Sequence, residues 1–255
     1  MPETKEMVVR DLLVSYTTYG SLSGGTPALF LHGWRSSKDV WKGVQSSLLD
    51  SGVSSIALDL PGFGQSESPK EAYDVDLYAG LVHEWMKKLN IESAFLIGHS
   101  FGGRIAIQCG ARYPAVFKKI VLVDSAGIRE KNAGRDAVKG VAGIMKPFFA
   151  PAFMQPLRRA LYRLMGAEDY LKTPELKETF VNVIEEDLSP LLPKITAPVL
   201  ILWGANDRDT SPEDGKKMAS LIPASRFVLL PGAGHYSFLD VPQAFTSELI
   251  AFLKS

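Results

Sequence analysis

A serine stands between two glycines at the point where an apolar run changes into a helical pattern. Residues 94–97 form the apolar run, and Gly-His-Ser-Phe-Gly (residues 98–102) follows it directly. A serine held on a tight strand-to-helix bend projects its hydroxyl above the sheet, where it can act as a nucleophile. Glycines suit the flanking positions because a Cβ there would crowd the bend. The pattern therefore predicts that Ser100 is a nucleophile.

The chain holds four histidines from which a base for Ser100 could come. His235 lies between a glycine and a tyrosine in a loop after an apolar strand, where a histidine has little structural purpose, so it is the predicted base. His83 falls on an amphipathic helical pattern and is expected at the surface. His99 is too close in sequence to turn back onto Ser100 and is expected to pack beside it. His32 follows another apolar strand and begins the segment His-Gly-Trp.

The base needs an acid to orient it, and the acid should also follow a strand. Residues 198–203 form the most hydrophobic run of the chain, and Asp207 comes shortly after it. Asp207 is the predicted acid. Asp124 closes the apolar strand at residues 120–123 and remains its competitor, because a carboxylate there would lie on the same edge of the sheet. Asp209 is expected to be a solvated carboxylate.

Five motifs, taken in order, resemble those of the α/β-hydrolase family over nearly the whole chain. They are His-Gly-Trp (32–34), Asp-Leu-Pro-Gly-Phe-Gly-Gln-Ser (59–66), Gly-His-Ser-Phe-Gly-Gly (98–103), Gly-Ala-Asn-Asp (204–207) and Gly-His (234–235). The chain order serine, aspartate, histidine agrees with the resemblance. The resemblance implies a capped, serine esterase-like member of the family, in which the backbone N–H groups of Trp34 and Phe101 form the oxyanion hole.

Strand-like and helix-like segments alternate along the chain, which predicts an α/β fold with a mostly parallel sheet and helices on both faces. Residues 7–19 indicate an opening antiparallel pair. The expected strands that follow are 28–31, 54–58, 94–97, 120–123, 199–203 and 226–230. The expected helices are about 39–49, 76–89, 101–112, 212–221 and 242–253. The hydrolase core is thus expected to comprise residues 1–125 and 193–255.

The alternation breaks between residues 126 and 192, where prolines divide an aromatic and methionine-rich stretch into short segments. Inserted between two core strands, this stretch is expected to form a small helical cap over Ser100 and an apolar wall of the pocket. The candidate substrate-binding residues are Phe148, Phe149, Phe153 and Tyr162 of the cap, together with Tyr236.

Composition limits the classes of partner. The 255 residues are 46% hydrophobic, and 28 basic residues balance 28 acidic ones, so no nucleic-acid partner is implied. One cysteine, Cys109, fits a reducing compartment. Residues 1–6 are charged where a signal peptide needs an apolar stretch, and no apolar run approaches about 18 residues. We expect a cytoplasmic protein with no membrane partner, no metal and no organic cofactor; the oligomeric state stays open.

Three functions remain open at this point. The favoured hypothesis is a hydrolase of carboxylic esters with small to medium apolar groups, acting through an acyl-enzyme. The second is a C–C bond hydrolase of vinylogous diketones, the products of ring fission. Such relatives usually carry Asn at the position of His99 and Trp at that of Tyr236, so both residues count against it. The third is a ligand receptor that keeps the triad but only binds.

Overall fold

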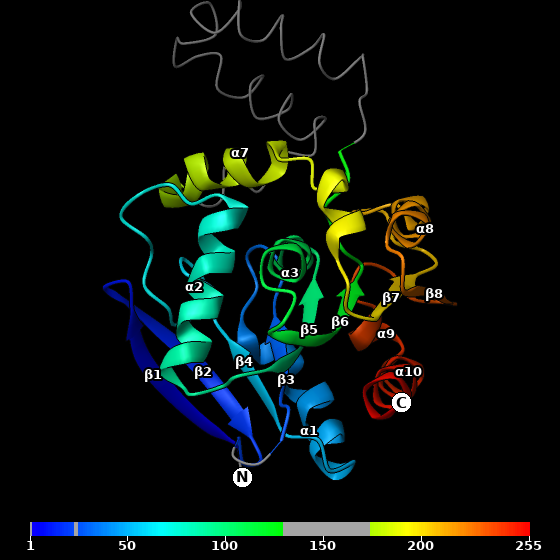
Figure 1. Ribbon diagram of the computed structural model, residues 1–255, viewed down its shortest axis with the longest axis horizontal. Coiled ribbons are helices and arrows are strands. Elements are labelled where there is room, and N and C mark those ends of the chain that lie inside the picture. The colour runs from blue at the N-terminus through cyan, green and yellow to red at the C-terminus, as the bar shows by residue number, and fades with distance from the viewer. Residues whose placement is uncertain (1, 23–24, 130–173) are drawn as a thin grey trace, which may run out of the picture.

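The computed structural model describes residues 2–22, 25–129 and 174–255, and an eight-stranded sheet forms the centre of this part of the chain (Figure 1). The strand order is β1-β2-β4-β3-β5-β6-β7-β8. The strands are β1 (Glu3–Val9), β2 (Leu12–Tyr19), β3 (Ala28–Leu31), β4 (Ser55–Leu58), β5 (Ala94–His99), β6 (Phe117–Val123), β7 (Val199–Gly204) and β8 (Ser225–Leu230). β2 is antiparallel to both β1 and β4, and all the other pairs are parallel.

Helices cover both faces of the sheet, as the alternation predicts (Figure 1). One face carries α2 (Val75–Lys88), α3 (Phe101–Arg112) and α8 (Pro212–Leu221). The other carries α1 (Lys42–Asp50) and α10 (Pro242–Lys254), which also contact each other. Short segments complete the described fold: η1 (Lys38–Trp41), η3 (Pro174–Leu176), α7 (Lys177–Glu185), η4 (Ser189–Lys194) and α9 (Ser237–Asp240).

The central strands β3, β4 and β7 are buried along their whole length because they pack against helices on both sides. In β3, Leu29 and Leu31 belong to the core under α2 and α3, whereas Ala28 and Phe30 belong to the core over α1 and α10. This alternation with a period of two residues follows from the pleat of a strand. The α/β-hydrolase fold expected from the sequence is confirmed.

Several expected boundaries differ from the observed ones. The opening antiparallel pair begins at Glu3 rather than at residue 7. The helix expected over residues 39–49 is a 3₁₀ turn, η1, followed by α1. The turn begins at Lys38, whose backbone N–H donates to the buried Asp59 carboxylate at 2.6 Å. A tertiary hydrogen bond therefore fixes this start.

The predicted cap is described only at its two ends, residues 126–129 and 174–192. There α7 lies near the carboxyl ends of the strands (Figure 1), and the Thr179 hydroxyl accepts a 3.0 Å hydrogen bond from the Tyr73 backbone. The candidate residues Phe148, Phe149, Phe153 and Tyr162 lie outside the described residues. None of the helices in the described ranges is both long enough and apolar enough to cross a membrane.

Candidate active site

Ser100 is the single residue between β5 and α3. Its backbone has φ 50° and ψ −108°, a left-handed conformation that is uncommon for a residue with a side chain. The chain can bend this sharply because its neighbours are glycines: a Cβ on Gly98 would collide with the backbone of Gly102, and one on Gly102 with the carbonyl of Leu31. The bend expected from the sequence is therefore present, with the Ser100 side chain at its apex.

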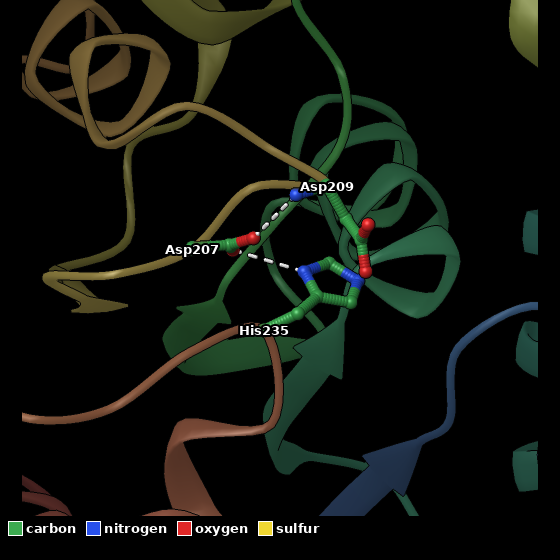
Figure 2. Close-up of side chains that lie close together, drawn as sticks. All are labelled: Asp207, Asp209 and His235. Carbon is green, nitrogen blue, oxygen red and sulfur yellow. Dashed lines mark hydrogen bonds and ion pairs between the residues drawn. The ribbon is translucent and has the colours of Figure 1, made fainter. Parts of the chain in front are cut away.

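The structure brings Ser100, His235 and Asp207 into one hydrogen-bonded chain. His235 Nε2 lies 3.0 Å from Ser100 Oγ, and His235 Nδ1 lies 2.9 Å from Asp207 Oδ2. Figure 2 shows the second of these contacts. His235 reaches Ser100 from the loop between β8 and α9, and Asp207 reaches His235 from the loop after β7. A serine, an imidazole and a carboxylate in this arrangement can move the serine proton onto the imidazole.

Asp207 has the surroundings of an ionised group. Its Oδ1 accepts the backbone N–H groups of Asp209 at 2.9 Å and Thr210 at 3.1 Å, and its Oδ2 accepts the Thr210 hydroxyl at 2.8 Å. Burial alone would raise the pKa of Asp207, but the hydrogen bond and charge of His235, together with Thr210, outweigh burial and lower it. Burial likewise acts to lower the pKa of His235, and the bonded carboxylate of Asp207 reverses the direction and raises it.

Asp209 is exposed and is not part of the hydrogen-bonded chain. Figure 2 shows its carboxylate on the side of the His235 ring away from Asp207, and the ligand atoms of the three side chains lie within 4.8 Å of one another. Two carboxylates and an imidazole could hold a divalent cation. Both ring nitrogens of His235 are already engaged, one by Asp207 and one by Ser100, so a cation would have to displace one of them.

The two predicted donors to an oxyanion lie beside Ser100. Phe101 is the first residue of α3, where a backbone N–H has no acceptor within the helix. Trp34 follows Gly33, and a Cβ built on Gly33 would come within 3.4 Å of the Ser100 Cβ. The loop after β3 therefore passes close to the nucleophile, as an oxyanion site shared by the two N–H groups would require.

Buried polar groups hold the loop after β3 in place. His32 Nε2 accepts the Leu60 backbone N–H at 3.0 Å, and His32 Nδ1 lies 2.8 Å from the Gly33 carbonyl. Burial lowers the pKa of His32 to about 4, so the ring is neutral. The Lys38 ammonium forms a 2.6 Å ion pair with Asp59, and the two side chains are 3% and 0% exposed. These contacts tie the loop to the segment after β4.

The other two histidines are outside the hydrogen-bonded chain. His99 is buried, and its Nε2 lies 2.8 Å from the backbone carbonyl of His235, to which it donates when protonated there. Burial lowers the pKa of His99 to about 3, so it stays neutral. His83 stacks on Tyr113 on the outer side of α2, and burial lowers its pKa. His99 therefore packs beside the site, as expected, and supports the loop that carries His235.

An aromatic cluster lines the region next to the Ser100 bend. The Trp34 ring lies 4.8 Å from Phe63, 5.2 Å from Phe101 and 5.1 Å from Phe180. The sequence argument missed Phe63 and Phe180; the only signal was a phenylalanine inside the Pro-Gly-Phe-Gly turn, where an exposed turn would favour a polar residue. Tyr236, a candidate for substrate contact, is 37% exposed and stands 5.6 Å from the His235 ring.

Asp124, the competing candidate for the acid, is buried and its carboxylate is bonded to Gly204 and Ser237. Its Oδ1 accepts the Gly204 backbone N–H at 2.7 Å, and its Oδ2 accepts the Ser237 hydroxyl at 2.6 Å and backbone N–H at 3.1 Å. Burial raises the pKa of Asp124 to about 7. It is Asp207, not Asp124, that carries the hydrogen bond to the imidazole.

A mostly parallel sheet with a serine bend after β5 and a histidine loop after β8 defines the α/β-hydrolase class. The family model described as "Alpha/beta hydrolase family" matches residues 28–248, and the chain belongs to this family. It is 30% identical over 251 residues to the AB hydrolase superfamily protein YisY of Bacillus subtilis (strain 168), covering 91% of this chain and 92% of that protein.

Solved structures of the class superpose on almost the whole chain. A bacterial membrane phospholipase A is 27% identical with a TM-score of 0.79, covering 99% of this chain and 86% of that one. The esterase EaEST from Exiguobacterium antarcticum is 25% identical with a TM-score of 0.77, covering 99% and 100%. A meta-cleavage product hydrolase from Pseudomonas fluorescens IP01, 21% identical over 98% and 97% with a TM-score of 0.75, shares the fold.

Proposed function

We propose that this hydrolase cleaves carboxylic esters of small to medium apolar groups, with Ser100 as nucleophile, His235 as base and Asp207 as the acid that orients it. The observation that carries the proposal is the unbroken hydrogen-bonded chain from Ser100 Oγ through His235 to Asp207, at 3.0 and 2.9 Å. A carboxylate with a lowered pKa beside an imidazole with a raised pKa is the electrostatic pattern that such a chain requires.

Each residue has a defined step. His235 Nε2 takes the Ser100 proton while Ser100 Oγ attacks the ester carbonyl, and Asp207 stabilises the imidazolium that forms. The backbone N–H groups of Trp34 and Phe101 hold the developing oxyanion. His235 then gives its proton to the leaving alcohol, and a water activated by the same imidazole hydrolyses the acyl-enzyme.

The apolar substrate class rests on the aromatic cluster beside the bend. Trp34 and Phe101 carry the proposed oxyanion donors on their backbones, and the Trp34 ring packs against the rings of Phe101 and of Phe180 in α7. An acyl or alcohol group held at the donors would therefore lie near aromatic carbon. Each CH₂ that enters such a pocket contributes about 0.8 kcal/mol, which corresponds to about fourfold in kcat/KM.

The experiment is a kcat/KM series of p-nitrophenyl esters from acetate to palmitate, run beside a ring-fission dienoate. We expect a rise to butyrate or hexanoate and then a fall as the acyl chain outgrows the pocket. Cleavage of the dienoate without hydrolysis of any ester would support the C–C bond hydrolase instead, the alternative that His99 and Tyr236 disfavour. Binding of both compounds with turnover of neither would support a receptor.

Ser100→Ala tests the nucleophile in the same series. Loss of a triad nucleophile costs on the order of 10⁴ to 10⁶ in kcat, and the melting temperature should stay near that of the wild type. Ser47→Ala is the matched control and should keep full activity, because the Ser47 hydroxyl donates to the Gly43 carbonyl at 3.1 Å within α1. A folded Ser100→Ala protein with a tenth of the wild-type rate would contradict the mechanism.

A further inference from the structure

A buried carboxylate that the proposed mechanism does not use lies beneath the site. Asp124 is fully buried, follows β6 and has a left-handed backbone with φ 44°, which is uncommon for an aspartate. Three donors converge on its two oxygens, at 2.6, 2.7 and 3.1 Å. A carboxylate with several short hydrogen bonds in a buried place can join the segments that donate to it.

The donors come from the two loops that carry the proposed acid and base. Gly204 ends β7 and lies three residues before Asp207, and its N–H binds Oδ1 of Asp124. Ser237 lies two residues after His235, and both its N–H and its hydroxyl bind Oδ2 of Asp124. The two loops are thus joined through one side chain, 113 residues away in sequence from Ser237.

The main chain of Asp124 makes the same connection. Its carbonyl oxygen lies 3.1 Å from the Thr210 hydroxyl, which donates to Asp207 Oδ2 at 2.8 Å and lies 3.4 Å from His235 Nδ1. The loops also meet directly, where the Asn206 N–H donates to the Ala233 carbonyl at 2.8 Å. Ala233 precedes His235 in the chain. After His235, Ser237 connects the same loop to the acid loop through the Asp124 carboxylate.

We propose that Asp124 is a positioning residue, whose carboxylate fixes the loop of His235 relative to the loop of Asp207 and so holds the imidazole at hydrogen-bonding distance from Ser100. This inference rests on the proposed function. A displacement of about 1 Å in a reacting group costs about 100-fold in rate, so loosening this connection should lower kcat while leaving KM nearly unchanged.

Two substitutions remove different parts of the connection. Asp124→Asn replaces one of the two carboxylate oxygens by an NH₂ group. Gly204 and Ser237 each donate a backbone N–H to a different oxygen, so the NH₂ must face one of these donors and that hydrogen bond is lost. Ser237→Ala removes only the 2.6 Å hydroxyl contact and leaves the backbone N–H on the carboxylate. We expect kcat to fall about 10- to 100-fold in Asp124→Asn and about 3- to 10-fold in Ser237→Ala, with KM within about twofold.

The double variant distinguishes a shared connection from two separate effects. If Ser237 acts through Asp124, the double variant should be no slower than Asp124→Asn alone, because interacting residues are not additive. Asp74→Ala is the control for loss of stability: Asp74 caps α2 by accepting the Leu77 N–H at 2.8 Å, and alanine cannot replace this cap. It should lower the melting temperature and leave kcat unchanged.

A second readout does not depend on the substrate: the rate at which a fluorophosphonate labels Ser100, measured well below the melting temperature. Labelling should fall in the same proportion as kcat. Equal labelling of wild type and variants, additive losses, or an equal fall in Asp74→Ala would overturn the positioning role. If Asp124→Asn does not fold, Ser237→Ala decides. If the wild type hydrolyses no ester but the variants are labelled more slowly than the wild type, the proposed ester hydrolysis is refuted and the positioning role of Asp124 is supported. If the wild type is not labelled, both proposals are refuted.

Discussion

Replacement of Asp207 by asparagine should reverse the tautomer of His235. Oδ1 of Asp207 accepts two backbone N–H groups, so the amide oxygen of Asp207→Asn must occupy that side. The NH₂ group then takes the place of Oδ2, 2.9 Å from His235 Nδ1. One of its hydrogens can go to Nδ1 and the other to the Thr210 oxygen, and the Thr210 proton, released from Asp207, can then go to the Asp124 carbonyl. Every group is satisfied, but the imidazole proton is now on Nε2.

With a proton on Nε2, His235 faces Ser100 Oγ as a donor and cannot take the serine proton. The expected loss is about 10⁴ in kcat, or about 5.4 kcal/mol of transition-state stabilisation, with the fold intact. The assay is steady-state hydrolysis of p-nitrophenyl butyrate, with circular dichroism and melting temperature measured on the same samples. Because Asp209 is exposed and outside the chain, Asp209→Asn is the nearby control and should be mild.

Two results would refute this reasoning. The first is an Asp207→Asn variant within about tenfold of the wild-type kcat, since a wrong tautomer leaves no base for the serine. The second is a larger loss in Asp124→Asn than in Asp207→Asn, which would give the role of orienting acid to Asp124. The positioning role proposed for Asp124 requires a loss far below about 10⁴.

The remaining predictions concern pH and stability. Only neutral His235 can act as a base, and Asp207 raises the pKa of His235, so the acid limb of kcat/KM should lie above about 6.5. In Asp207→Asn the acid limb of the residual activity should move to lower pH, and an unmoved limb would contradict this prediction. Lys38→Met leaves the Asp59 carboxylate buried without its cation and should lower the free energy of unfolding by about 3 kcal/mol in urea titrations. Lys216→Met, which breaks an exposed pair with Glu213, should cost no more than about 1 kcal/mol, and equal losses would refute the burial argument.

The fold could be predicted because its signals are local. The parallel strands β3, β5, β6 and β7 each contain an apolar run that is almost wholly buried, at residues 28–31, 94–97, 120–123 and 199–203. The candidates Ser100, Asp207 and His235 each follow a strand, and the carboxyl ends of parallel strands meet at one edge of the sheet. Their order and spacing therefore sufficed to bring them together in the prediction.

The supporting contacts could not be predicted, because they join segments far apart in the chain. The Lys38–Asp59 ion pair spans 21 residues, and nothing near Lys38 distinguishes it from a surface lysine. The Asp124–Ser237 contact spans 113 residues, so Asp124 looked like a second acid. Phe180 meets Trp34 only because α7 lies over the end of the sheet. The cap aromatics proposed as substrate contacts lie outside the described residues.

The gathering of the chemical groups at one edge of the sheet leaves the opposite edge available for attachment to a solid support. The turn between α3 and β6 lies at that edge, and Ala115 is exposed there. Cys109 is the only cysteine of the chain; it is fully buried, and burial raises the pKa of its thiol, so it reacts poorly. In Ala115→Cys a maleimide surface would therefore capture a single thiol. Every immobilised molecule would then present Ser100 toward the solution in one orientation.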